Sequence, residues 1–304
     1  MCEKKDIINQ LEIDSDIKIS EEQKISIREK INNILTYVPK IGVLGKTGVG
    51  KSSLCNALFG KDVCEIDDIQ SCTRNPQEVF LSIGDKGLKL FDLPGLGENQ
   101  ERDEEYLKLY NKILPDLDVI LWLLKGDDRA FTNDIDFYKR LSNYFSEDIK
   151  KSFYLVVNQI DKIEPCREWN DIDHKPGDKQ LFNIGLKIES ISENFPFPKS
   201  KIIAISAKEK YNLIELIDQI ITDLPKESSV SLGRQINMDH ISSDSYNKIV
   251  EDFGNNVYDI VYNDTNNLIL ARIVKKAIKM AVGAFNFITA PIGKILDFIG
   301  KLFH

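Results

Sequence analysis

Residues 45–52 read GKTGVGKS, which matches the template G-x-x-x-x-G-K-S of loops that hold a polyphosphate. Glycine lets the backbone wrap around phosphate oxygens with its N–H groups turned inward. The Lys51 ammonium would neutralise the β- and γ-phosphates, and the Ser52 hydroxyl would bind the Mg²⁺ ion that bridges them. We therefore expect a triphosphate site formed by Gly45, Lys46, Thr47, Gly48, Val49, Gly50, Lys51, Ser52 and Ser53.

Three later stretches could complete the site and choose the base. Asp92 of DLPG could hold Mg²⁺ through water, while the Gly95 N–H could sense the γ-phosphate. The Asp161 carboxylate of NQID can accept hydrogen bonds from both N1 and N2 of guanine, and adenine offers no such pair of donors. Asn158 would brace that loop, and the Ala207 N–H of SAK could donate to guanine O6. The predicted guanine site is Asn158, Asp161, Ser206, Ala207 and Lys208.

The elements that position these motifs alternate between strand and helix. Such alternation predicts an α/β fold with a mostly parallel sheet of six strands, covered on both faces. The short link at 84–87 predicts one antiparallel pair at the sheet edge. Each motif follows a strand, and ligands of open α/β sheets bind at that edge. The expected strands are 41–44, 79–83, 88–91, 119–124, 153–157 and 202–205, and the expected helices are 51–59, 103–114, 133–145, 180–194 and 213–224.

Both ends of the chain are predicted to be helical. In residues 1–37, Ser20 and Gln23 have the spacing of a capping box ahead of an apolar helix face. Residues 225–231 (PKESSVS) are interpreted as a polar linker, beyond which the helical pattern returns. We therefore expect an N-terminal helical segment at 1–37, a nucleotide-binding domain at 38–225 and a C-terminal helical region at 226–304.

The five motifs GKTGVGKSSLCNALFG, SCTRNP, DLPG, NQID and SAK resemble those of translation-factor-related (TRAFAC) P-loop GTPases, nearest the Era-like and septin-like branch. The phosphate loop is also similar to those of chloroplast-import and immune-associated GTPases. The resemblance covers about residues 38–225. It implies a GTP-binding switch that hydrolyses GTP with Mg²⁺, and it implies that Thr73 is the switch residue that closes on Mg²⁺ and the γ-phosphate. Lys51, Thr73 and Gly95 would then be the catalytic residues, with Ser52, Thr73 and Asp92 around the metal.

Two positions depart from that family. Gln159 replaces the lysine of the guanine motif, which predicts weaker nucleotide affinity with guanine choice preserved by Asp161. Leu96 stands where Ras-like relatives have the glutamine that orients the attacking water, so unaided turnover should be slow, about 10⁻⁴ to 10⁻² s⁻¹. A group supplied by a second G domain or a partner would then complete the site, with Arg74 and Arg102 as candidates in this chain.

Residues 268–304 carry a positive charge on a chain whose net charge is −8. Arg272, Lys275, Lys276 and Lys279 share one helix face, and apolar residues lie opposite. One interpretation is a basic amphipathic hairpin on an anionic membrane. The other is a helical domain whose apolar faces pack on the N-terminal helix or the nucleotide-binding domain.

Composition narrows the remaining alternatives. The net charge of −8 disfavours nucleic acid as the main partner, and five cysteines without a Cys-x-x-Cys pair indicate free thiols in a reducing compartment. No secretory signal is visible, so we expect a cytoplasmic protein, with a membrane surface as the alternative location. The competing functions are a GTP-dependent scaffold with negligible turnover, a ribosome- or RNA-assembly GTPase, and an ATPase or nucleotide kinase, which Asp161 disfavours.

Overall fold

The computed structural model describes residues 19–46, 48–59, 77–83, 86–92, 107–108, 110–142, 152–195, 197–282 and 286–303, with 77–83 and 86–92 described as backbone. Thr47, Thr73 and Gly95 lie outside the described residues, as do Arg74, Leu96 and Arg102.

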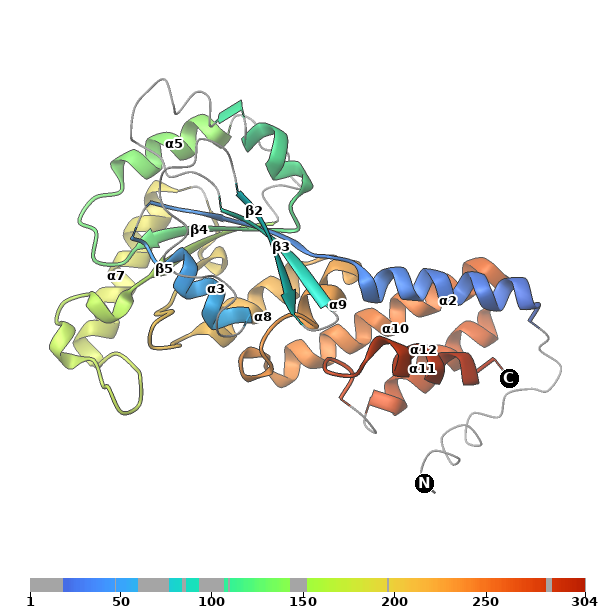
Figure 1. Ribbon diagram of the computed structural model, residues 1–304. Helices are drawn as coiled ribbons and strands as arrows, with labels where there is room; N and C mark the ends of the chain where they lie inside the picture. The colour runs from blue at the N-terminus through green and yellow to red at the C-terminus, as the bar shows by residue number, and fades with distance from the viewer. Residues whose placement is uncertain are drawn as a thin grey trace.

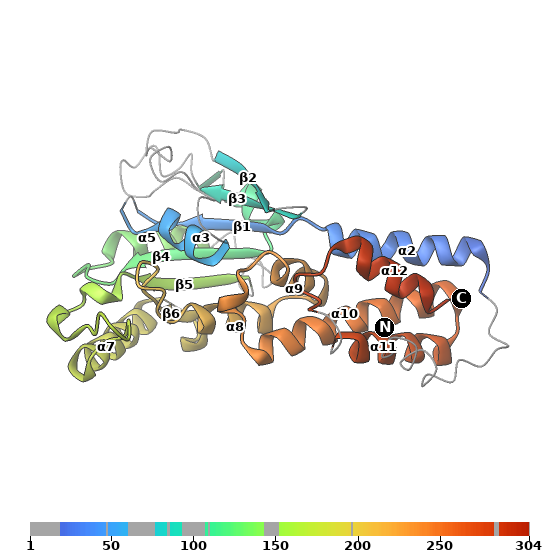
Figure 2. The ribbon, with the colours of Figure 1, turned by 60° about the horizontal axis from the view of Figure 1, so that its bottom comes forward.

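A six-stranded sheet forms the centre of the nucleotide-binding region, with the strand order β2-β3-β1-β4-β5-β6 (Figure 2). All neighbouring pairs are parallel except β2 and β3, which form the antiparallel pair at one edge. The prediction of a mostly parallel sheet with one antiparallel edge strand is therefore confirmed. The strands are β1 (Lys40–Leu44), β2 (Gln77–Ile83), β3 (Lys86–Asp92), β4 (Val119–Lys125), β5 (Phe153–Asn158) and β6 (Ile202–Ala204).

The central strands are buried on both faces, and their alternating side chains belong to two separate cores. In β4, Leu121 and Leu123 face one core, while Trp122 and Leu124 face the other. The side chains divide in this way because successive residues of a strand point to opposite faces of the sheet. The first core contains α3 (Lys51–Phe59) and α8 (Leu213–Asp223), and the second contains α5 (Thr132–Ser142) and α7 (Asp178–Asn194), so helices cover both faces (Figure 1).

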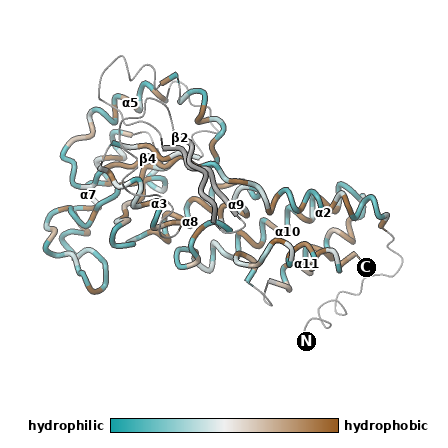
Figure 3. The backbone as a smooth tube through the Cα atoms, viewed as in Figure 1, coloured by the Kyte–Doolittle hydropathy of each residue, from teal (hydrophilic) through white to brown (hydrophobic). Residues whose placement is uncertain are grey.

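Helices from both ends of the chain form an arm that extends away from the sheet (Figures 1 and 2). It consists of α2 (Glu21–Thr36), α10 (Ser243–Thr265), α11 (Leu268–Val282) and α12 (Ile292–Lys301). The expected capping box is present, since Ser20 Oγ accepts from the Gln23 N–H and Gln23 Oε1 accepts from the Ser20 N–H. Hydrophobic residues recur along the helices of the arm (Figure 3), and buried ones from all four helices belong to the same core as α3 and α8. The arm therefore shares a continuous core with one face of the sheet.

The expectation of a polar linker at 225–231 was wrong, because α9 (Lys226–Gly233) is a helix at the base of the arm. Its serines are buried, although serine-rich sequence usually indicates a loop. Burial is tolerated because each hydroxyl has a partner far away in the sequence. Ser228 donates to Asp118 (2.7 Å), Ser229 donates to Asp252, and Ser231 donates to the Tyr37 carbonyl oxygen (2.5 Å).

The apolar faces of residues 268–304 are buried inside the arm, as the packing interpretation expected. Val274 and Ala277 of α11 and Ile295 and Ile299 of α12 are each at most 2% exposed. On the basic face of α11, Lys275 and Lys279 are held by Glu251 of α10, and this pairing lowers the pKa of the Glu251 carboxyl. The interpretation of residues 268–304 as a membrane hairpin is not supported, because the apolar faces that would enter the membrane are buried inside the arm. Among the described residues, no helix is long and apolar enough to cross a membrane.

Arg234, at the end of α9, anchors the turn between α11 and α12. Its guanidinium is buried and donates to the carbonyl oxygens of Phe287 (2.6 Å) and Ala290 (2.8 Å). Arg234→Ala should lower the free energy of unfolding by about 3 kcal/mol, since each carbonyl loses a charged donor. Arg28→Ala is the control, because Arg28 is exposed and pairs with Asp297 at 3.4 Å. Chemical denaturation of both variants measures their free energies of unfolding. An equal loss of stability in the two variants would contradict this role of Arg234.

Candidate functional site

The phosphate loop lies between β1 and α3 and has the backbone shape that its glycines permit. Gly45, Gly48 and Gly50 have φ angles of +145°, +79° and +92°, a region that side chains disfavour. A Cβ atom at Gly50 would also lie 2.4 Å from Asn158 Nδ2, so that position has no room for a larger residue. Lys51 Nζ donates to the Gly45 carbonyl oxygen at 2.9 Å, which places the ammonium inside the loop. The loop therefore has the open backbone cradle that a phosphate requires.

Asn158, at the end of β5, connects the phosphate loop to both guanine motifs. Its side chain is 1% exposed. Nδ2 donates to the Val49 carbonyl oxygen (2.8 Å), and Oδ1 accepts from the Ala207 N–H (3.0 Å). One buried amide thus fixes the spacing of three loops that lie far apart in the sequence. It uses its donor on one loop and its acceptor on another.

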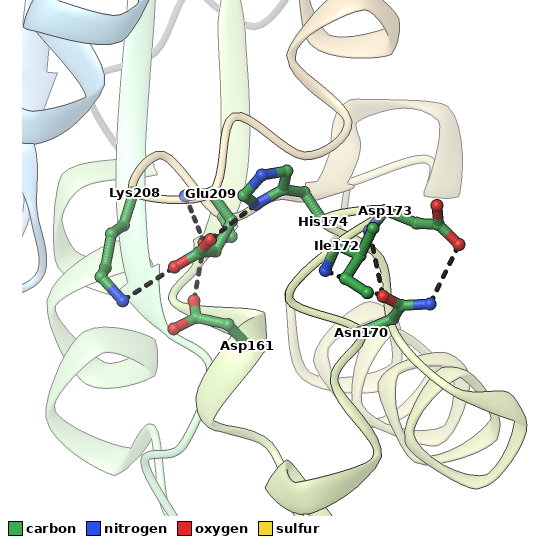
Figure 4. Close-up of polar contacts among 8 residues, drawn as sticks. Asp161, Asn170, Ile172, Asp173, His174, Lys208 and Glu209 are labelled. Carbon is green, nitrogen blue, oxygen red and sulfur yellow. Dashed lines mark hydrogen bonds and ion pairs between the residues drawn. The ribbon is translucent and has the colours of Figure 1, made fainter.

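Asp161 lies at the outer edge of this site, beside the SAK loop (Figure 4). Its Oδ1 accepts from the buried Ser206 hydroxyl at 2.7 Å, and Ser206 Oγ in turn accepts from the Glu209 N–H at 3.2 Å. Because the Ser206 proton is committed to Asp161, the carboxylate is oriented before any ligand binds. The Lys208 ammonium is exposed and pairs with Glu209 (2.7 Å), which raises the pKa of Lys208.

The loop that follows the guanine motif packs against the SAK loop. His174 Nδ1 lies 2.9 Å from Glu209 Oε2, and the Trp169 ring meets Tyr211 edge-on at 5.7 Å (Figure 4 shows the histidine contact). A bridge between Asn170 and Lys175 closes the loop on itself. Residues 164–179 thus form a surface loop that packs against the guanine side of the site.

A contact that the sequence did not predict joins the phosphate loop to α5. Lys46 Nζ lies 2.6 Å from Asp134 Oδ2, and Asp134 is 3% exposed. Burial raises the pKa of the Asp134 carboxyl, and the Lys46 ammonium opposes that rise. Both residues line a cavity of about 230 Å³ with Val49, Lys125 and Asp128. Sequence spacing could not reveal this pair, because 88 residues separate its members.

The described residues therefore include most of the predicted site. The structure brings the phosphate loop, Asn158, Asp161, Ser206 and Ala207 together at the carboxyl edge of the sheet. Asp92 ends β3 beside Val43 of β1, two residues before the loop begins at Gly45, although the side chain of Asp92 is not described. The magnesium and switch residues Thr73 and Gly95 stay sequence predictions. The cradle of left-handed glycines, with Lys51 inside and Ser52 in the first turn of α3, fits a magnesium-bound triphosphate.

Comparison with known proteins agrees with this geometry. Residues 40–159 match a family described as 50S ribosome-binding GTPases. The uncharacterised Escherichia coli protein YkfA is 34% identical to the chain, and the match covers 88% of this chain and 85% of YkfA. The uncharacterised Escherichia coli protein YfjP is 40% identical, and that match covers 67% of this chain and 68% of YfjP. A structure of Era with MgGDPNP and a segment of 16S ribosomal RNA is 26% identical, with a TM-score of 0.45, over 62% of this chain. That match spans 58% of the Era chain, less than two thirds of its length.

The matched range contains the phosphate loop, β1 to β5 and the first residues of the guanine motif. The long match to YkfA also extends over most of the chain, so the similarity does not rest on the phosphate loop alone. The chain therefore belongs to the Era-like P-loop GTPases, as a GTP-binding enzyme that hydrolyses GTP to GDP.

Proposed function

We propose that this GTPase is a slow molecular switch whose catalytic site is completed by a second G domain or by a partner protein. The phosphate loop, residues 45–53, would hold the triphosphate, with Lys51 on the β- and γ-phosphates. Asp161, oriented by Ser206, would choose guanine, and the Ala207 N–H would share its hydrogen bond between Asn158 Oδ1, its acceptor in the structure, and the guanine O6 atom. Bound Mg²⁺ would offset phosphate charge, with Ser52, Thr73 and Asp92 around it.

The observation that carries the proposal is the buried Asn158 side chain, which ties the phosphate loop to the SAK loop. This contact supports a site that is already assembled for binding. Binding alone does not make a fast catalyst, because Leu96 offers no hydrogen bond to the attacking water. A GTPase that binds its nucleotide tightly but activates the attacking water poorly is expected to hydrolyse GTP rapidly only when another protein supplies a catalytic group. Switch segments around Thr73 and after Gly95 would order with GTP and relax after hydrolysis.

Turnover measured against protein concentration tests the proposal. If two copies complete each other's site, the hydrolysis rate per molecule should rise by at least about tenfold with concentration, since a charged group supplied in trans is worth about 10³-fold when fully engaged. Arg74→Ala and Arg102→Ala should remove the rise if either arginine supplies the charge. A slow rate that stays constant with concentration would leave an unrelated partner as the source. Undetectable turnover under every condition would instead support the scaffold alternative.

Ribosome or RNA assembly is the second candidate, favoured by the description of the matching family as ribosome-binding. The net charge of −8 weighs against it, because phosphate backbones repel an acidic surface. Co-sedimentation with ribosomal particles in the presence of GTP separates the two candidates. The RNA candidate predicts binding that weakens steeply with salt.

A further inference from the structure

Gln159 makes a direct contact with the phosphate loop, although its position in the guanine motif suggested only a lost lysine. Its Nε2 donates to the Gly48 carbonyl oxygen at 2.7 Å. Its Oε1 accepts from Lys162 Nζ at 2.8 Å. Both contacts lie on the loop side of the guanine motif, next to the buried Asn158 bond to Val49.

The two contacts fix the orientation of the Gln159 amide. An ammonium group can only donate, so the amide oxygen must face Lys162 and the amide nitrogen must face Gly48. The backbone of Gln159 is left-handed, with φ of 61°, a conformation that residues with a side chain disfavour. A costly backbone conformation that aims a side chain at a functional loop is the pattern expected of a functional residue.

Holding these carbonyl groups has a consequence for the nucleotide. In a trans peptide the C=O and the next N–H point to opposite sides. Gln159 holds the Gly48 carbonyl on the guanine-loop side, so the Val49 N–H points the other way, where it makes only a long bond of 3.3 Å to the Lys46 carbonyl oxygen. A phosphate oxygen can replace that weak acceptor. Asn158 holds the next carbonyl, that of Val49, in the same manner.

We infer that Gln159 and Lys162 form a two-residue clamp that positions the phosphate loop and slows nucleotide release. Gln159 supplies the hydrogen bond to Gly48, and Lys162 acts only through Gln159 by orienting its amide. The clamp keeps a carbonyl oxygen away from the phosphates and leaves an N–H directed at them. It therefore replaces the missing lysine of the motif, and the weaker affinity expected from the sequence alone does not follow. The inference rests on the proposed roles of the phosphate and guanine loops.

The test is the dissociation rate of a fluorescent GDP analogue from the full-length chain. Gln159→Glu keeps the size and the Lys162 contact but places an acceptor against the Gly48 carbonyl, so release should accelerate by at least about tenfold. Gln159→Ala should accelerate release by about fivefold, and Lys162→Met by about twofold to threefold. Lys179→Met is the control, since Lys179 is exposed and its ammonium lies 4.0 Å from the Glu168 carboxylate.

The double variant gives the decisive measurement. Because Lys162 acts through Gln159, adding Lys162→Met to Gln159→Ala should change the release rate no further. Melting of the nucleotide-free variants should match that of the wild type, which separates positioning from a general loss of stability. Release rates within twofold of wild type for Gln159→Glu, or equal effects of Lys162→Met in both backgrounds, would overturn the clamp. Failure of the wild type to bind any guanine nucleotide would instead refute the proposed function itself.

Discussion

Replacing Asp161 with asparagine will move the base preference of this GTPase from guanine to xanthine. The carboxylate can accept hydrogen bonds from both N1 and N2 of guanine, whereas an amide can accept through only one of its two atoms. The Ser206 hydroxyl already donates to this side chain and accepts a hydrogen bond from the Glu209 N–H, so an asparagine oxygen will face Ser206. The amide nitrogen then faces the base, where it opposes the guanine amino group and pairs with the C2 carbonyl of xanthine.

The expected loss is large, because two hydrogen bonds to a charged acceptor are worth about 1.5–3 kcal/mol each. GTP affinity should fall by about 10²-fold to 10⁴-fold, while xanthosine triphosphate becomes the preferred ligand. Competition binding with both nucleotides measures this change. Asp173→Asn is the matched control, because Asp173 is a half-exposed carboxylate on the neighbouring loop, and its variant should bind like the wild type. Unchanged preference in Asp161→Asn would show that the base lies elsewhere.

Replacing Lys51 with methionine should lower GTP hydrolysis by about 10²-fold to 10³-fold, the size seen when one preorganised donor to a developing charge is removed. Lys51 opens α3, and its ammonium already lies within the loop through its bond to the Gly45 carbonyl oxygen. Phosphate oxygens gain negative charge during transfer, so the loss should fall mainly on turnover. Methionine keeps the length of the side chain, and thermal melting should therefore change little.

Single-turnover hydrolysis at saturating GTP checks this expectation. Lys276→Met removes one positive charge from an exposed site on α11 and controls for the change in net charge. If Lys51→Met hydrolyses GTP at the wild-type rate, the phosphate loop does not hold the reacting phosphates. If binding is lost completely, displacement of a fluorescent nucleotide will show it separately from the chemical step.

Much of the fold could be predicted because its signals are local. The alternation in β4 places Trp122 and Leu123 in opposite cores, and a strand buried on both faces reads as a continuous apolar run. The capping box of Ser20 and Gln23 spans four residues and needs no tertiary context. The motifs that follow β1, β5 and β6 were predictable for the same reason, since each joins a strand to a loop of recognisable chemistry.

What the sequence did not predict depends on partners distant in the chain. The serines of α9 suggested a linker, because the acceptors that satisfy them lie 110, 23 and 194 residues away in the sequence. The Lys46 contact with Asp134 and the Gln159 contact with Gly48 likewise join segments that lie far apart in the sequence. Gln159 could be recognised as a departure from the family, but its role needs the left-handed backbone that aims its amide. Contacts of this kind follow from the packing of the fold.

The most direct test of the central claim is calorimetric titration of the full-length chain with GTP, GDP and ATP in the presence of Mg²⁺. A site that reads guanine through Asp161 and Ala207 should bind GTP and GDP with similar affinity. It should reject ATP by about 10³-fold or more, because adenine has no N1 proton for the Asp161 carboxylate and turns an amino group toward the Ala207 N–H. Binding of ATP as tight as that of GTP would contradict the assignment of these loops as a guanine site.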